Sequence, residues 1–168
     1  MTYTQPILRH FQLLALIFIL VQLFGCSSSK KLSLGPDTRS GTALHHKVVN
    51  DALQLQGQPY VMGGESPDEG FDCSGLVYYV YNKQGLKLPR DTWSLGNQLP
   101  SVQMDERQPG DLVFFSIGQR PLSHVGIYVG DDRFVHAASK HRGKVIVSDL
   151  KDPYWHHHFS AVRRPHSR

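Results

Sequence analysis

The chain has 168 residues, a formal net charge of +4, and a hydrophobic content of 40%. This length accommodates one domain with its own core, and the sequence contains no internal repeats. The charge is only mildly basic, and no lysine–arginine cluster is interleaved with aromatic residues, which argues against nucleic-acid binding. We therefore predict a single small domain that acts as a monomer and has no nucleic-acid partner.

The N-terminal segment has the pattern of a lipoprotein signal peptide. Arg9 and His10 form a short positive region, and an apolar run follows from Phe11 to Phe24. The run is shorter than the roughly 20 residues of a membrane span but suits a signal peptide. Cys26 follows the small residue Gly25 and resembles the cysteine of a bacterial lipobox, which becomes lipidated after cleavage. An uncleaved anchor or a plain signal peptide is the alternative, because Phe24 is bulkier than this pattern usually shows.

This interpretation divides the chain into three parts. Residues 1–25 form the signal peptide, residues 26–42 form the lipidated Cys26 with a flexible Ser/Lys/Gly/Pro-rich tether, and residues 43–165 form the folded domain. Ser27 follows Cys26, where an aspartate would indicate retention in the inner membrane of enteric-type bacteria. We expect an anchor in the membrane and a location at the periplasmic face of the outer membrane.

The folded part begins with helical patterns and ends with strand patterns. Apolar residues recur at helical spacing from Leu44 to Leu55, a second helical stripe runs from Cys73 to about Gly85, and a shorter helix is expected over Thr92–Gln98. The later part has short alternating or apolar runs that predict strands. These runs are Leu112–Phe115, Val125–Val129, Phe134–Ala137, Val145–Val147 and Phe159–Val162. Helices first and strands afterwards indicate an α+β fold.

Cys73 is the candidate nucleophile. The chain has two cysteines, and lipidation of Cys26 would leave Cys73 without a disulfide partner. Asp72 is a plausible N-cap, so Cys73 would lie in the first turn of a helix, where the helix dipole should lower its pKa below about 8.5. The backbone N–H groups of that turn could stabilise an oxyanion. Gly75 costs helix stability and suggests a close approach at that point. A buried structural cysteine is the alternative.

Two of the ten histidines, His124 and His136, flank the hairpin signal Gly130-Asp131-Asp132. A three-residue loop would pair Val129 with Arg133 and place both histidines on one face as diagonal neighbours, about 7–8 Å apart. A two-residue loop would place them on opposite faces, so we predict the three-residue loop. His124 would then be the general base for Cys73 and the acid for the leaving amine, and His136 would orient its ring.

Together, several motifs resemble those of the NlpC-type cell-wall peptidases, a papain-like cysteine peptidase family. They occur in the family's order and cover about residues 44–164. The matching segments are Pro59–Gly64, Phe71–Val77, Leu88–Arg90, Pro109–Phe115, His124–Gly130 and Phe134–Ala137. Met62 stands where the family usually has an aromatic residue, and we interpret it as a core or loop packing residue.

The resemblance implies a papain-like α+β fold in which N-terminal helices pack on a central antiparallel sheet of about five or six strands. It implies a catalytic triad of Cys73, His124 and His136. The substrate would be an amide bond in the peptidoglycan stem peptides, either D-γ-glutamyl–diaminopimelate within a stem or diaminopimelate–D-alanine across a cross-link. The lipoprotein start and short domain look most similar to the Spr-type outer-membrane branch.

The resemblance also implies three residues that contact the substrate. Tyr60 would lie beside the nucleophile, where its hydroxyl would assist the oxyanion or the substrate. Asp72 and Ser74 would line a subsite for polar groups of the stem peptide.

Other functions remain as alternatives. The zinc-ligand types of Cys73, His124 and His136 allow a zinc hydrolase. A non-catalytic peptidoglycan-binding lipoprotein and a thiol-dependent acyltransferase are two further possibilities. The run His156-His157-His158 is interpreted as surface histidines, since neighbours on a strand point to opposite faces. We expect no metal and no other cofactor.

Overall fold

The computed structural model describes residues 36–138 and 143–166, with side chains from residue 43 onward. The predicted signal peptide and Cys26 lie outside the described residues. Helix α2 (Pro36–Gln54) begins inside the segment predicted as a tether. Proline is favoured at the first position of a helix and an acidic residue in its first turn, and the sequence has Pro36 followed by Asp37.

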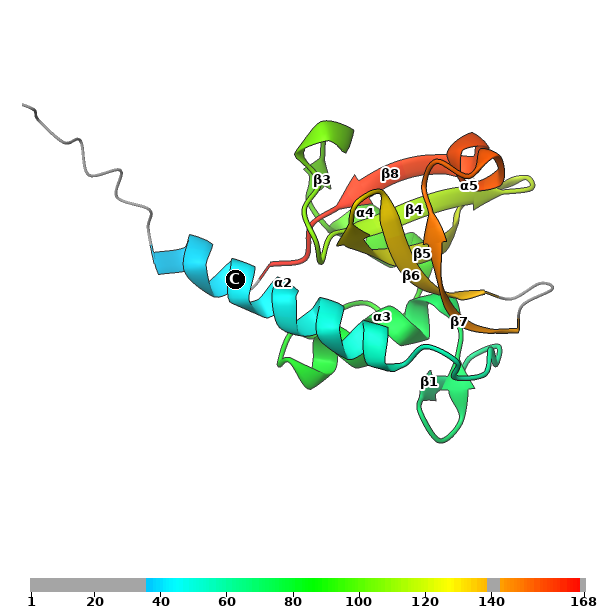
Figure 1. Ribbon diagram of the computed structural model, residues 1–168, viewed down its shortest axis with the longest axis horizontal. Helices are drawn as coiled ribbons and strands as arrows, with labels where there is room; N and C mark the ends of the chain where they lie inside the picture. The colour runs from blue at the N-terminus through cyan, green and yellow to red at the C-terminus, as the bar shows by residue number, and fades with distance from the viewer. Residues whose placement is uncertain (1–35, 139–142, 167–168) are drawn as a thin grey trace, which may run out of the picture. The chain divides into compact units, whose positions relative to one another are not determined.

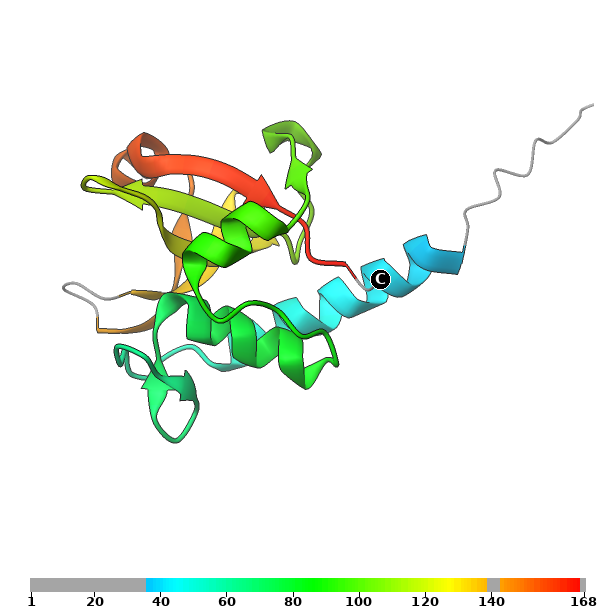
Figure 2. The same cartoon turned by 180° about the vertical axis from the view of Figure 1, so that it is seen from behind.

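In the described residues, three helices precede the main sheet, as predicted. Helix α2 is followed by α3 (Cys73–Lys83) and α4 (Thr92–Gln98). Helices α2 and α3 run side by side in both views (Figures 1 and 2). In the described part of the chain, no helix combines the length and the apolar character needed to cross a membrane.

The main sheet has six strands in the order β3-β8-β4-β5-β6-β7, and every adjacent pair is antiparallel. The predicted α+β fold and strand number are confirmed. The strands are β3 (Ser101–Val102), β4 (Leu112–Ile117), β5 (Arg120–Gly130), β6 (Arg133–Ala138), β7 (Lys144–Asp149) and β8 (Phe159–Arg163).

Five short elements were not predicted from the sequence, and strand β3 of the main sheet is one of them. A two-stranded ribbon, β1 (Glu65–Ser66) with β2 (Gly70–Phe71), precedes α3, and a 3₁₀ helix, η2 (Met104–Glu106), follows β3. Helix α5 (Pro153–His158) lies between β7 and β8. Strands of two residues and a helix of six are too short to establish a hydrophobic period, which explains why pattern analysis missed them.

The main sheet is covered by apolar side chains on both faces. The larger core lies between the sheet and the N-terminal helices, and it includes Val48, Leu76 and Val125. The smaller core, on the other face, contains Phe115 and Phe134 together with aromatic side chains of α5 and β8. Successive residues of a strand point to opposite faces, so each central strand contributes to both cores.

The hairpin between β5 and β6 has the predicted register but not the predicted turn. Tyr128 pairs with Phe134, as expected, whereas the loop is the two-residue turn Asp131-Asp132 between Gly130 and Arg133. Both aspartates have positive φ angles, of 50° and 57°, as two-residue hairpin turns require. A β-bulge between Tyr128 and Gly130 adds one extra residue to β5, which gives the same register as the predicted three-residue loop. The bulge therefore keeps the two histidines on one face.

Gly75 lies where helix α3 touches the preceding loop, so we expect a methyl group there to destabilise the fold. A Cβ on Gly75 would lie 2.0 Å from the backbone oxygen of Gly64 and 2.8 Å from an Arg90 nitrogen. Because the loop backbone would have to move, Gly75→Ala should lower the free energy of unfolding by about 2 kcal/mol, despite its better helix propensity.

Urea unfolding measures this change. The control is Asn82→Ala on the exposed side of α3, which should stay within about 0.5 kcal/mol of wild type. A Gly75→Ala protein as stable as wild type would show that the contact does not constrain the helix.

Candidate active site

The carboxylate of Asp72 organises the start of helix α3. It accepts hydrogen bonds from the backbone N–H of Gly75 at 2.7 Å and of Gly63 at 2.9 Å, and from Nη1 and Nη2 of Arg90 at 2.9 and 3.0 Å. Burial alone would raise the pKa of Asp72, but the bonds from Arg90 and the two backbone groups hold it below the usual range. Asp72 is therefore ionised and caps the helix.

Ser74 belongs to the same network. Its hydroxyl is buried, donates to Asp72 Oδ1 at 3.3 Å and accepts from Arg90 Nη1 at 3.0 Å. Arg90 also donates to the backbone oxygens of Gly63 and Gly64, which joins this network to the loop before β1. Asp72 and Ser74 thus hold the local structure, and their predicted contact with substrate stays a prediction.

Cys73 is the first residue of α3 and has a free, partly exposed thiol. The prediction that the helix start lowers its pKa is wrong. Burial, and secondly the negative charge of Asp72, raise the pKa of the thiol, whereas the backbone N–H groups of Val125, Ser74 and Cys73 oppose this rise. The N-cap that begins the helix also places a carboxylate beside the sulfur. The Cys73 thiol is therefore neutral at neutral pH.

His124 on β5 and His136 on β6 lie together, as predicted. Nε2 of His124 is 2.8 Å from Nδ1 of His136, and the ring planes are nearly perpendicular, at 88°. Burial lowers the pKa of His124 to about 4, and burial together with the charge of His124 lowers the pKa of His136 well below its usual value. Both imidazoles are neutral at pH 7.

The position of Cys73 relative to His124 follows from the strand. Val125, whose N–H faces the Cys73 sulfur, is the next residue along β5. Because Nε2 of His124 is engaged by His136, the ring nitrogen left for the thiol is Nδ1. Within the described residues, no hydrogen bond joins Cys73 to His124. Hydrogen bonds between catalytic groups are often long without substrate and tighten when substrate binds.

An aromatic cage covers the histidine pair. The ring of Trp155 stacks on His124, with centroids 5.4 Å apart and planes 26° apart, and meets His136 edge-on at 4.8 Å. Phe115 and Phe134 pack against the same indole at 4.8 and 5.1 Å. This cage supplies the burial that keeps both imidazoles neutral.

Two further residues contact the histidine pair and were not predicted from the sequence. Trp155 lies on α5, whose start was signalled by Asp152-Pro153, an N-cap followed by the proline favoured at the first helical position. Ser148 lies on β7, and its hydroxyl is 2.9 Å from Nε2 of His136. No pattern marks Ser148, because its role depends on the pairing register of β6 and β7.

Tyr60 is near enough to Cys73 and Asp72 for their charges to act on its phenol, and its predicted role at the active site stays a prediction. Burial raises the pKa of its phenol, and the neighbouring Cys73 and Asp72 add to the rise. The hydroxyl thus stays protonated at neutral pH and able to donate a hydrogen bond. It donates to the sulfur of Met62 at 3.8 Å.

Met62 is not a packing residue, contrary to the prediction. Its side chain is 81% exposed. The N–H of Gly64 bonds to the oxygen of Val61, and Gly63 has a φ of 80°, so Met62 occupies the first central position of a tight turn. That position projects the side chain away from the core.

The run of three histidines lies on helix α5 rather than on a strand. Among the described residues, no group of three or more histidine, cysteine, aspartate or glutamate side chains is arranged to hold a metal ion.

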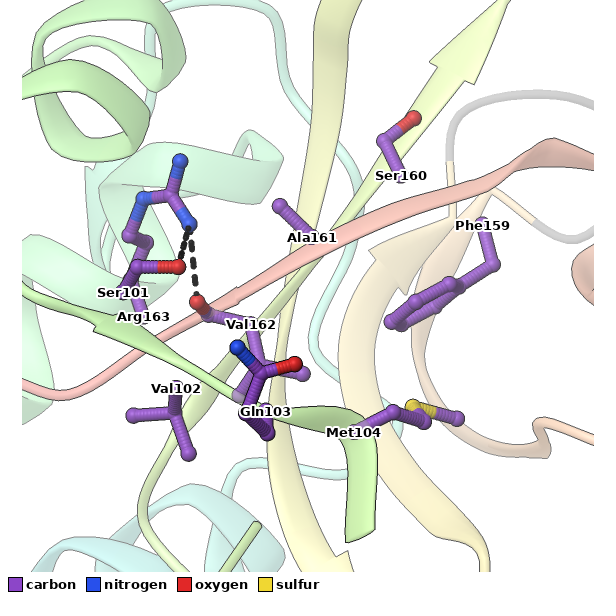
Figure 3. A pocket seen from close by; sticks show the side chains of 9 residues that line it. All are labelled: Ser101, Val102, Gln103, Met104, Phe159, Ser160, Ala161, Val162 and Arg163. Atoms are coloured by element: carbon purple, nitrogen blue, oxygen red, sulfur yellow. Dashed lines mark hydrogen bonds between the residues drawn. The ribbon is translucent and has the colours of Figure 1, made fainter. Parts of the chain in front are cut away.

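A pocket of about 390 Å³ lies along the edge formed by β3 and β8 (Figure 3). Arg163 is one of the residues that line it and donates to the hydroxyl of Ser101 and the oxygen of Val162, both at 3.0 Å. None of the residues predicted to act in catalysis lines this pocket, so it is separate from the cysteine–histidine site.

The comparisons with known proteins agree with this fold. A cysteine at a helix start, packed on an antiparallel sheet that carries a histidine pair, is the arrangement of a papain-like α+β fold. The NlpC/P60 family model matches residues 57–164, and the chain therefore belongs to the NlpC/P60 family. The resemblance drawn from the motifs is confirmed.

The chain is similar to the murein DD-endopeptidase MepS/murein LD-carboxypeptidase of Escherichia coli, with 31% identity over 191 residues and full coverage of both chains. It is 41% identical over 122 residues to the gamma-DL-glutamyl hydrolase of Bacillus subtilis. This match covers 70% of this chain and 28% of the hydrolase. A solved NLP/P60 protein of Staphylococcus aureus has a TM-score of 0.68 and 32% identity, covering 90% of this chain and 48% of that one. The chain thus spans less than half of two of these relatives.

We expect Cys73 to ionise at a higher pH in the folded protein than in the unfolded one. Burial and Asp72 raise its pKa, so the thiol stays protonated below that pKa and becomes a thiolate only above it. Thiolate absorbance at 240 nm, taken as the difference between wild type and Cys73→Ser, measures this ionisation. The subtraction removes Cys26 and the tyrosines, and the same difference in urea gives the unfolded reference. A folded midpoint at or below the unfolded one contradicts the assignment.

Proposed function

We propose that this protein is a lipid-anchored peptidoglycan endopeptidase in which Cys73, His124 and His136 form the catalytic triad. The observation that carries the proposal is the 2.8 Å contact between His124 Nε2 and His136 Nδ1. It holds the ring of His124 and leaves Nδ1 free, next to the residue whose N–H faces the sulfur of Cys73.

The neutral resting state suggests a mechanism in which proton transfer accompanies attack. As Sγ of Cys73 bonds to the carbonyl carbon, Nδ1 of His124 takes the thiol proton. The oxyanion accepts hydrogen bonds from the backbone N–H groups of Cys73 and Ser74 and from the Tyr60 hydroxyl. The protonated His124 then gives its proton to the leaving amine, and a thioester remains on Cys73.

Hydrolysis of the thioester reverses these roles. His124 takes a proton from water as the water attacks the thioester carbonyl. Collapse of the second tetrahedral intermediate releases a carboxylic acid and restores the thiol of Cys73. His136 stays hydrogen-bonded to His124 throughout and stabilises the imidazolium formed in each half-reaction.

The substrate proposed is an amide bond of the peptidoglycan stem peptides or their cross-links. The relative that matches the whole chain is named a murein DD-endopeptidase, which favours the diaminopimelate–D-alanine cross-link. The name gamma-DL-glutamyl hydrolase, of a relative matched over part of its length, supports the alternative bond within a stem. The sacculus experiment below distinguishes the two bonds.

The proposed location follows from Cys26. Lipidation at this position would anchor the enzyme to the periplasmic face of the outer membrane, where the described domain would act as a monomer on the adjacent wall. The full-length match to a murein hydrolase supports a cell-envelope location.

Cys73→Ala should reduce digestion of purified sacculi by at least about 1,000-fold, because no other group supplies the nucleophile. Mass spectrometry of the released muropeptides, with assay of new amino groups, measures the reaction and identifies the bond. Wild-type activity should survive a chelator and be lost to a thiol alkylator, which separates the triad from a zinc hydrolase.

The surface variant Asn82→Ala is the matched control for this experiment and should retain full activity. A Cys73→Ala protein that digests sacculi as fast as wild type contradicts the proposed nucleophile. Binding of wild type to sacculi without release of amino groups would instead support a binding protein or an acyltransferase.

Cys26→Ser should abolish lipidation without changing the domain. Cells expressing wild type and grown with labelled palmitate should yield a labelled protein in the outer-membrane fraction, whereas the variant should be unlabelled. Incorporation of label into the Cys26→Ser protein would place the lipid at another residue, and unlabelled wild type would refute the anchor.

A further inference from the structure

The histidine pair continues to a third strand. On β6, His136 pairs with Ile146 of β7, and Phe134 pairs with Ser148. Ser148 is thus the diagonal neighbour of His136 on the same face, and its hydroxyl lies 2.9 Å from Nε2 of His136. His124, His136 and Ser148 therefore form one hydrogen-bonded row across β5, β6 and β7.

Each neutral imidazole carries one proton, so the direction of donation along this row is the same at every step. If Ser148 accepts from Nε2 of His136, then Nδ1 of His136 is bare and accepts from Nε2–H of His124. Nδ1 of His124 is then bare and can take the thiol proton. If Ser148 donates instead, the row reverses, and Nδ1 of His124 carries a hydrogen that prevents it from acting as a base.

We propose that Ser148 is a positioning residue that sets the tautomer of both histidines by accepting a hydrogen bond from His136. The proposal rests on the proposed roles of Cys73 and His124. It adds that the hydroxyl of Ser148, on the side of His136 away from His124, keeps His124 in the tautomer that can act as a base. Ser148 would do so without contacting the nucleophile or the substrate.

The surroundings of Ser148 favour acceptance. His136 is completely buried, so an N–H at its Nε2 needs a protein partner, and the Ser148 oxygen is the partner that the described residues supply. Ser148 is only half-buried and lies on β7, the last strand of the sheet, so its own hydrogen can be donated to water. Because Ser148 can donate its own hydrogen to water, its oxygen is free to accept from His136. The hydrogen bonds of the row then leave Nδ1 of His124 bare and able to take the thiol proton of Cys73.

Ser148→Thr and Ser148→Val form a matched pair, because the two side chains have the same shape and differ in the hydroxyl. In full-length protein labelled with ¹⁵N-histidine, NMR shifts distinguish protonated from bare ring nitrogens. Wild type and Ser148→Thr should show His136 and His124 protonated at Nε2. Ser148→Val should show a mixture of tautomers for His136, and Ser148→Ala provides a second variant that removes the hydroxyl without added bulk.

Kinetics on a soluble cross-linked muropeptide form the second measurement. Ser148→Val should lower kcat roughly fivefold with little change in KM, as expected for loss of one neutral hydrogen bond, and Ser148→Thr should restore it. Wild type with His136 protonated at Nδ1, or tautomers and kcat that are equal in the threonine and valine proteins, would overturn the proposal. The NMR result does not depend on turnover, so failure of the proposed peptidase activity would be recognised separately.

Discussion

The carboxylate of Asp72 is the constraint on which the site depends. It ends the loop that contains Gly63, begins helix α3 through Gly75, and receives both Nη atoms of Arg90, which reaches the same loop. These contacts join three segments that are distant in sequence, and Cys73 is the next residue along the chain. The position of the thiol is therefore determined by an ionised group on the neighbouring residue.

The same group contributes to the electrostatics of the Cys73 thiol. Burial, and secondly the carboxylate of Asp72, disfavour a thiolate, and together they outweigh the backbone N–H groups that favour one. The cage around Trp155 has the corresponding effect on the base, because burial favours neutral imidazoles. The contacts that fix the positions of Cys73 and His124 thus also help to keep both side chains neutral. In the proposed reaction, charges separate only when a substrate carbonyl is present to accept the negative charge.

Much of this arrangement follows from local patterns in the sequence. The Asp72–Cys73 helix start and the shared face of His124 and His136 were predictable because a cap and a strand register depend on neighbouring residues. The register was obtained with the wrong turn, since a bulge compensated for it, and bulges leave no periodic signal. The pKa of Cys73 and the contact of Ser148 with His136 depend on burial and pairing between distant segments, which local patterns do not specify.

Neutrality of the imidazoles also has a consequence for the proposed enzyme at acidic pH. An imidazole with an ordinary pKa of about 6.5 would be almost entirely protonated at pH 5 and unable to act as a base. With its pKa lowered to about 4, His124 would be about nine-tenths neutral at that pH. Burial beneath Trp155 extends the acidic range over which the base can accept a proton.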